Sequence, residues 1–224
     1  MTIIVHTVSG APRAWRVLLG LAFKGLPYEI RYLEASKGEH KSPDFLKLNP
    51  RGTVPVMQDG DITVRDSIGC LAWLDAAYPE KPLFGHTLTE TAEIWQTTLE
   101  CCDYLRAAGN GLLFSILVEN KPLPADDTEE RNALDTSARA MHAEFSFLES
   151  LLGERDFLAG NGPTAADAVA FPEVRLVERA VDKKPHIMGA LGFNETDNHY
   201  PRLAAWKARI NALPGYSKTI PRHW

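Results

Sequence analysis

One change of pattern, at a segment rich in proline and glycine, most constrains how this chain can fold. The segment is Tyr78-Pro79-Glu80-Lys81-Pro82-Leu83-Phe84-Gly85. Before it, short runs typical of β-strands are interleaved with short helical stretches, and after it the spacing of apolar residues is helical almost throughout. A chain of 224 residues has room for one large domain or two small ones. We therefore predict a first domain at residues 1–80, a linker at 81–87 and a second domain at 88–224.

The first eighty or so residues predict a small mixed sheet with helices. The stretch between the first two strands is long enough for a parallel crossover. The last two strands are joined through Asp59-Gly60, which is typical of an antiparallel hairpin. The expected strands are 3–5, 28–33, 53–57 and 62–64, and the expected helices begin at Pro12, Pro43 and Asp66.

The remainder predicts an all-helical domain, so the expected fold class is an α/β domain followed by an all-α domain. Helices are expected at 89–118, 129–152 and 202–213, and another begins at Pro163-Thr164-Ala165-Ala166-Asp167. Thr164 and Asp167 have the three-residue spacing of a capping box, which satisfies free backbone N–H groups at a helix start. Residues 182–201, rich in proline, asparagine and histidine, are expected to be irregular.

Charge and cysteine content exclude several function classes. The formal net charge of −5 argues against nucleic acids and anionic membranes as partners, because both need a basic surface. The longest strongly apolar stretch, 17–23, is far too short to cross a bilayer. No signal peptide is expected from the N-terminal residues. Three cysteines, two of them adjacent, fit a reducing compartment, so we expect a cytoplasmic protein. Scattered histidines without ligand spacing predict no metal site.

Val54-Pro55 interrupts a run that is otherwise typical of a strand. Proline cannot donate to a strand ladder, so it belongs at a sheet edge or in a special turn. If the bond before Pro55 is cis, the backbone N–H and C=O of Val54 point outward. An extended peptide ligand could then pair with them by strand addition. The alternative is a plain edge-strand proline.

Asp66-Ser67 stands where a strand becomes a helix. A helix N-terminus attracts a carboxylate, which the hydroxyl and backbone N–H of Ser67 can bind. Asp66 offers the opposite charge to an ammonium, so the pair suits the zwitterionic head of an amino acid. Simple N-capping is the alternative, and for these two residues alone it is the commoner explanation.

Two further polar positions lie in loops. His40 and Lys41 could hold a second carboxylate, although most such residues are only solvated. Ser9 lies in the turn ahead of the first helix, and its hydroxyl could stabilise a thiolate at the positive end of that helix. An ordinary turn serine is the alternative for Ser9.

These signals occur in an order that resembles the cytosolic glutathione transferase superfamily, with some similarity to bacterial β-etherases and to zeta- and theta-like members. The most specific stretch runs from Gly38 to Val56 and contains Asn49-Pro50-Arg51-Gly52-Thr53-Val54-Pro55, followed by Asp66-Ser67. Trp15-Arg16-Val17 resembles the first helix of the family. The segments 157–160, 163–167 and 201–206 resemble its helical half. The resemblance covers nearly the whole chain except about 182–198.

The resemblance implies a thioredoxin-like domain joined to an all-helical domain, usually in a homodimer. It also implies glutathione as the co-substrate. The cysteinyl backbone of glutathione would pair with Val54 beside a cis Pro55. Its γ-glutamyl head would bind Asp66 and Ser67, and its glycyl carboxylate would lie near His40.

The implied activity is that of a glutathione S-transferase. The protein would lower the thiol pKa of bound glutathione and direct the thiolate at a small apolar electrophile, because the thiolate is the nucleophile. Candidate residues for the electrophile pocket are Trp95, Leu99, Cys102 and Phe114.

One departure from the family pattern concerns the catalytic residue. Counting back from Val17 and Gly25, the catalytic Ser, Tyr or Cys of the family falls on Ala11, which has neither hydroxyl nor thiol. Ser9 is then the candidate catalytic side chain, and backbone N–H groups near Ala11 are the alternative. Three functions stay open: the transferase, a glutathione-dependent β-etherase or isomerase, and a non-catalytic glutathione-binding or structural protein.

Overall fold

Four strands form one mixed sheet in the computed structural model, which describes residues 2–153, 155–222 and 224. The strand order is β2-β1-β3-β4. β1 (Ile3–Thr7) runs parallel to β2 (Tyr28–Tyr32) and antiparallel to β3 (Val56–Asp59). β3 forms a hairpin with β4 (Ile62–Val64) around the predicted turn. The mixed sheet expected from the sequence is therefore present.

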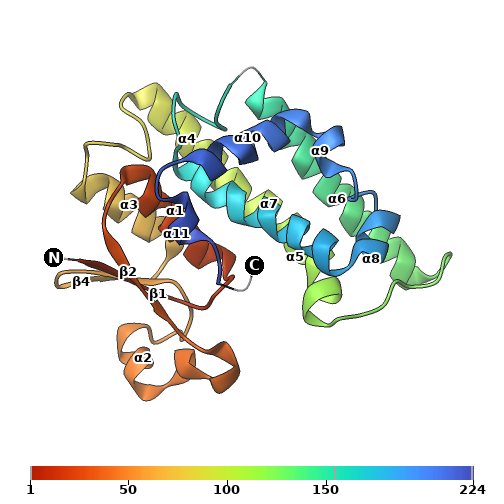
Figure 1. Ribbon diagram of the computed structural model, residues 1–224, viewed down its shortest axis with the longest axis horizontal. Coiled ribbons are helices and arrows are strands. Elements are labelled where there is room, and N and C mark those ends of the chain that lie inside the picture. Colours follow the sequence, from red (N-terminus) through yellow and green to blue (C-terminus); the bar gives the residue numbers. More distant parts are fainter. Residues whose placement is uncertain (1, 154, 223) are drawn as a thin grey trace.

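Three helices accompany this sheet (Figure 1). α1 (Pro12–Lys24) and α3 (Ser67–Ala77) pack against each other on one side of the sheet, and α2 (Pro43–Leu48) lies on the other side. Two 3₁₀ turns, Ala35–Lys37 and Glu39–Lys41, lead from β2 into α2. The loops after β1 and β4 lead into α1 and α3, and the turn after β3 leads into β4. Each of these connections is therefore held at both ends by a packed element.

The rest of the chain is helical, as predicted, after an irregular segment at 78–87. The predicted helix at 89–118 is one continuous run, made of α4 (Leu88–Glu100) and α5 (Arg106–Leu113), each followed by a π-helical turn at Cys101–Leu105 and Phe114–Val118. The further helices are α6 (Glu129–Leu152), α7 (Ala165–Lys183), α8 (Pro185–Ala190), α9 (Thr196–His199), α10 (Pro201–Ala212) and α11 (Tyr216–Thr219).

The prediction that residues 182–201 are irregular was wrong in part. α8 and α9 both lie in this stretch. Pro185 occupies the first helical position of α8, where its missing N–H costs nothing and its fixed φ favours the helix. The proline that suggested irregular backbone therefore begins a short helix.

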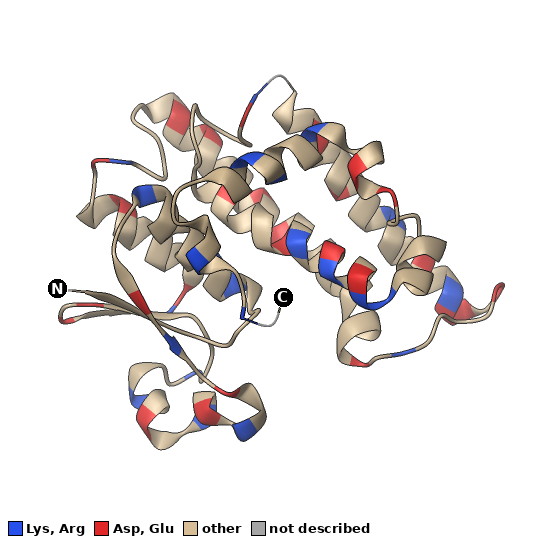
Figure 2. Ribbon diagram, in the orientation of Figure 1, with Lys and Arg blue, Asp and Glu red and all other residues tan. Residues whose placement is uncertain are grey.

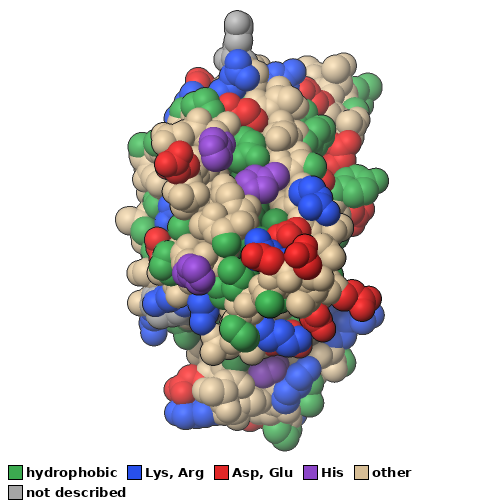
Figure 3. Space-filling view, turned by 90° about the vertical axis from the view of Figure 1, so that its right-hand side faces the viewer, with side chains coloured by type: hydrophobic (Ala, Val, Ile, Leu, Met, Phe, Trp, Pro, Cys, Tyr) green, Lys and Arg blue, Asp and Glu red, His purple; other side chains and the backbone are tan. Residues whose placement is uncertain are grey.

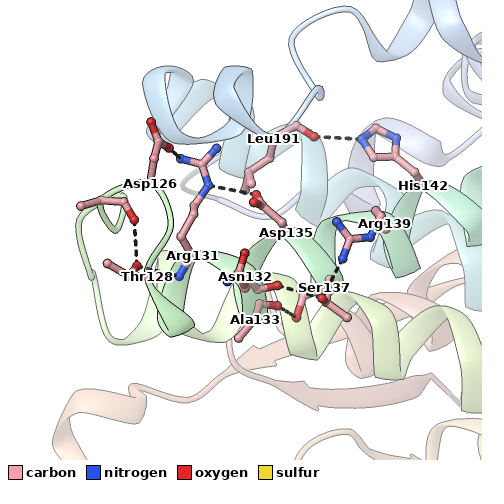
Figure 4. A network of polar contacts seen from close by, with 12 residues as sticks. Asp126, Thr128, Arg131, Asn132, Ala133, Asp135, Ser137, Arg139, His142 and Leu191 are labelled. Carbon is pink, nitrogen blue, oxygen red and sulfur yellow. Dashed lines mark hydrogen bonds and ion pairs between the residues drawn. The ribbon is translucent and has the colours of Figure 1, made fainter.

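The start of α6 shows how side chains fix a helix boundary (Figure 4). The Thr128 hydroxyl accepts a hydrogen bond from the Arg131 backbone N–H at 3.1 Å and donates to the Ala125 carbonyl at 2.7 Å. The Arg131 guanidinium forms ion pairs with Asp126 at 2.8 Å and Asp135 at 3.0 Å. These contacts begin the helix at Glu129, as the sequence predicted.

Asp167 connects three segments inside the helical half. Its buried carboxylate accepts hydrogen bonds from the Leu158 backbone N–H at 3.0 Å and from Trp206 Nε1 at 2.8 Å. It also accepts from both the backbone N–H and the hydroxyl of Thr164, at 2.8 and 3.0 Å. The predicted capping box at the start of α7 is present, and its acid also holds α10.

A buried ionic cluster joins the sheet half to the helical half. Arg16 on α1 pairs with Glu173 on α7 at 2.8 Å, and Arg106 on α5 reaches the same carboxylate oxygen at 2.8 Å. Near the C-terminus, Trp15 Nε1 donates to the Thr219 hydroxyl at 2.9 Å. α1 is therefore held by α7 and α11 at the same time, which fixes the position of its N-terminal end.

The surface carries charges of both signs. Acidic and basic residues are spread over both halves in Figure 2, and they alternate over the face of the helical half that Figure 3 presents. Within the described residues, no helix has the length and apolar character that crossing a membrane requires.

Candidate functional site

A cavity of about 840 Å³ lies where the start of α1, the loop before β3 and the junction of β4 with α3 meet. Four of the seven residues predicted for glutathione binding or catalysis line it, namely Val54 and Pro55 just before β3, and Asp66 and Ser67 at the start of α3. The other lining residues are Arg13, Asn49, Pro50, Arg51, Thr53, Thr63, Val64 and Arg65.

The loop before β3 is shaped by Asn49 and Gly52. The buried Asn49 amide donates to the Thr53 carbonyl at 2.7 Å, and its oxygen accepts from the Arg51 backbone N–H at 3.1 Å. Gly52 has a φ of +58°, and a Cβ placed there would lie 2.8 Å from the His40 carbonyl oxygen. A side chain at position 52 would therefore clash and strain the loop, which explains a glycine before Thr53.

The Val54–Pro55 peptide bond is cis. β3 begins only at Val56, later than the predicted start at Thr53. Pro55 has no N–H to give to a ladder, so the strand starts after it. Neither the backbone N–H nor the C=O of Val54 has a backbone partner among the described residues. Both groups therefore remain available at the edge of the cavity.

Asp66 caps α3 and still keeps one carboxylate oxygen for another partner. Its Oδ1 accepts from the backbone N–H groups of Ile68 at 2.8 Å and Gly69 at 3.1 Å. Those two bonds confirm the N-capping alternative, but Oδ2 takes no part in the cap. Ser67 follows as the first helical residue and is buried. The junction therefore presents an acceptor for a cation beside the N-terminus of a helix.

Three predicted residues lie outside the set that lines this cavity. The Ser9 hydroxyl accepts a hydrogen bond from the Arg222 backbone N–H at 3.1 Å. The Ala11 N–H donates to the Val8 carbonyl at 3.0 Å, so this amide is already used. His40 lies in the turn before α2, and its Nδ1 is buried without a hydrogen-bond partner in the described part of the chain. Of the described residues, only the twelve named above line the cavity.

Sequence reasoning missed three arginines that line the cavity. They come from separate segments: Arg13 from α1, Arg51 from the loop before β3 and Arg65 from the short connection between β4 and α3. The sequence held a signal for them, because each of the three arginines lies within three residues of a predicted site residue. The three guanidinium groups and the single Asp66 carboxylate leave an excess of two positive charges around the cavity.

The protein's own thiols are poor nucleophiles at neutral pH. Burial raises the pKa of Cys70 to about 12, and burial also raises the pKa of Cys101. Burial raises the pKa of Cys102 as well, against the opposing effect of Arg16, whose Nη1 lies 3.5 Å from its sulfur. Any thiolate chemistry here therefore needs a thiol from a ligand. In the described part of the chain, no group of three or more His, Cys, Asp or Glu residues could hold a metal ion.

The four candidates for an electrophile pocket do not form one in this cavity. Trp95 stacks on Phe84 with ring centroids 4.1 Å apart, which is a packing role. Leu99 and Phe114 are exposed on the long helical run. These positions stay predictions for a second substrate.

Comparison with known proteins agrees with this geometry. The model of the glutathione S-transferase N-terminal domain matches residues 11–77, and the model of the C-terminal domain matches residues 112–214. Glutathione S-transferase Z2 of Arabidopsis thaliana is 32% identical over 209 residues, which cover 93% of this chain and 86% of that protein. The chain belongs to the glutathione S-transferase family.

Solved structures of the family have the same fold. A glutathione S-transferase from the Antarctic clam Laternula elliptica superposes with a TM-score of 0.83 and 28% identity, covering 100% of this chain and 94% of that one. Beta-etherase LigF from Sphingobium sp. strain SYK-6 gives a TM-score of 0.80 at 23% identity, covering 98% of each chain. The predicted superfamily and fold class, a thioredoxin-like domain with an all-helical glutathione S-transferase domain, are confirmed.

Proposed function

We propose that this glutathione S-transferase binds glutathione in the 840 Å³ cavity and activates its thiol for attack on a small apolar electrophile. One observation carries the proposal. A single cavity brings together the unpaired backbone of Val54, the Asp66 carboxylate and the N-terminus of α3 at Ser67. These groups match an extended peptide with an amino-acid head.

Each polar group of glutathione has a complementary group in the cavity. The cysteinyl N–H and C=O would pair with Val54 by strand addition. The γ-glutamyl ammonium would meet Asp66 Oδ2, and its carboxylate would meet the Ser67 hydroxyl and backbone N–H. For the glycyl carboxylate, the guanidinium of Arg51 suits bidentate binding and lines the cavity, whereas the predicted partner His40 does not.

The reaction needs the thiol to ionise. Its proton leaves to solvent, the sulfur forms a bond to the electrophilic carbon, and a leaving group departs with its electron pair or a double bond takes up the charge. The β-etherase and isomerase alternatives begin from the same thiolate, so a panel of aryl ethers, cis-alkene diacids and halogenated aromatics separates them. Ala11 favours the non-catalytic alternative, which predicts an ordinary thiol pKa for bound glutathione.

Two variants of Asp66 test the binding site. Asp66→Asn keeps an oxygen that can accept from Ile68 and Gly69 but removes the charge that would meet the ammonium. Asp66→Ala removes both. Loss of the charge-assisted bond is expected to weaken glutathione binding by about 1.5–3 kcal/mol in both variants, measured by calorimetric titration. Only the alanine variant is expected to lose helix-cap stability, by about 0.5–2 kcal/mol.

Unchanged glutathione affinity in Asp66→Asn would remove Asp66 from the site. An affinity that falls only in Asp66→Ala would assign Asp66 to capping alone, because only that variant loses the cap.

We further propose that residues 1–80 form the glutathione-binding domain, that 88–224 form the helical domain and that 81–87 link them. The family resemblance also supports a homodimer, a cytoplasmic location and a role in detoxification.

A further inference from the structure

Arg13 is the cation that the first helix presents to the cavity. It is the second residue of α1, directly after Pro12, and its side chain is exposed. The guanidinium has no hydrogen-bond or ion-pair partner among the described residues. Arg16, one turn further on, is buried and paired with Glu173 at 2.8 Å. The two arginines of α1 therefore differ: one holds the fold together and the other faces the cavity.

The charges of the cavity and of glutathione fit each other only when the thiol is ionised. The lining has two more positive than negative charges, from Arg13, Arg51 and Arg65 against Asp66. Glutathione with a neutral thiol has two carboxylates and one ammonium, and thus one excess negative charge. Ionisation of the thiol adds the second. Asp66, Ser67 and Arg51 already meet the ammonium and the two carboxylates. Of the two remaining cations, Arg65 is next to Asp66 at the γ-glutamyl end, so Arg13 at the α1 end of the cavity is left for the sulfur.

We propose that Arg13 is the catalytic residue that stabilises the glutathione thiolate. This inference rests on the proposed function. Arg13 lines the same cavity as Val54, beside which the cysteinyl residue would lie. A cation beside a thiol favours the ionised form and lowers its pKa.

Arg13 acts as an electrostatic partner and not as a base. A guanidinium is always protonated in proteins, so it cannot accept the thiol proton. The proton passes to water, the thiolate stays paired with Arg13, and the pair separates as the sulfur forms its bond to the electrophilic carbon.

The other candidates for this role, Ser9 and Ala11, are not among the described residues that line the cavity, and both contact other parts of the fold. The Ser9 hydroxyl accepts from the Arg222 backbone at 3.1 Å, and the Ala11 N–H donates to Val8 at 3.0 Å. Pro12 has no N–H. Arg13 is the residue of this turn that lines the cavity in the described structure.

The test titrates the thiol of bound glutathione by its ultraviolet thiolate absorbance in wild type, Arg13→Gln and Arg13→Lys. The pKa in Arg13→Gln is expected to rise by about one unit or more above wild type. Turnover at neutral pH should fall about tenfold for each unit, because the thiolate fraction falls by that factor. Arg13→Lys keeps a positive charge, so the pKa of the bound thiol is expected to stay close to its lowered value in wild type.

Two controls separate this role from others. Affinity for S-methylglutathione, which has no ionisable thiol, is expected to change less than about threefold in Arg13→Gln, about 0.65 kcal/mol. Arg139→Gln removes the same charge from an exposed position on α6, where Arg139 contacts Thr136 (Figure 4), and is expected to leave the thiol pKa unchanged.

The outcomes are distinguishable. A lowered thiol pKa in wild type that persists in Arg13→Gln would overturn the role of Arg13 and leave the proposed function intact. An unchanged pKa with a loss of S-methylglutathione affinity of about tenfold or more would make Arg13 a carboxylate anchor and also overturn it. Wild type that binds no glutathione would overturn the proposed function and this inference together.

Discussion

At the scale of single residues, neighbouring positions of α1 point in different directions and have different roles. Arg13 faces the cavity, while Trp15 and Arg16 point into the interior and hold the helix to α11 and α7. The sequence identified Val54, Asp66 and Ser67, because proline and helix-start residues have local signatures. It missed Arg13, because an exposed arginine has no pattern that separates a ligand contact from a solvated charge.

Ser9 belongs to the contact with the C-terminal segment. We expect Ser9→Ala to lose the acceptor for the Arg222 N–H and to lower the free energy of unfolding by about 0.5–1.5 kcal/mol. The thiol pKa of bound glutathione should stay at the wild-type value. Urea denaturation and thiol titration check the two statements, and a raised thiol pKa would instead make Ser9 the thiolate partner.

His6 gives the fold a dependence on pH. Burial lowers the pKa of His6 below its usual 6.5, and Arg31 lowers it further, against the hydrogen bond to Gln58 at 2.8 Å. The unfolded chain therefore binds this proton more readily than the folded one. The contribution of neutral His6 to the free energy of unfolding is fully present above pH 6.5. It is lost as the pH falls from there through the lower pKa that His6 has in the folded protein.

The measurement is urea unfolding of wild type and His6→Gln at several pH values between about 7.5 and 5. The variant should lose stability less steeply than wild type over this range. Equal slopes would contradict the assignment.

At the scale of elements, alternation and capping residues predicted most of the architecture. Local chemistry fixes three of these boundaries. The hairpin turns at Asp59-Gly60, α2 begins after the capping residue Ser42, and α6 begins after the capping residue Thr128. The π-helical turns at Cys101–Leu105 and Phe114–Val118 were not predicted, because the spacing of apolar residues does not distinguish one extra residue per turn over so short a stretch.

The capping box at α7 is assigned to stability. We expect Thr164→Ala to cost about 0.5–2 kcal/mol. Asp167→Ala should cost more, because it leaves the donors of Leu158 and Trp206 buried without an acceptor, at about 1–3 kcal/mol each. Urea denaturation measures both. Thr164→Ala that keeps full stability but loses turnover would reverse the assignment.

At the scale of the whole molecule, the contacts that join the two halves depend on residues far apart in the chain. Arg16 and Glu173 are 157 positions apart, so no local pattern predicts their ion pair. The family resemblance, not periodicity, gave the relation between the sheet and the helices. The same holds for the position of the cavity between α1, the loop before β3 and α3.

We expect a homodimer in solution. Exposed apolar side chains on the long helical run and on β4, among them Leu99, Tyr104 and Ile62, would be covered by a second copy. Light scattering at micromolar concentration should give twice the 24.8 kDa mass of one chain. A mass equal to one chain would contradict this.

Thiol activation is the central claim, and titration of glutathione bound to the wild-type protein tests it most directly. Thiolate absorbance is followed against pH with the protein in excess over glutathione, and the protein alone serves as the blank for its own three cysteines. We predict that the bound thiol ionises at least about one pKa unit below free glutathione. Glutathione that binds but ionises at its solution pKa would contradict the account and make this chain a binding protein without the chemistry.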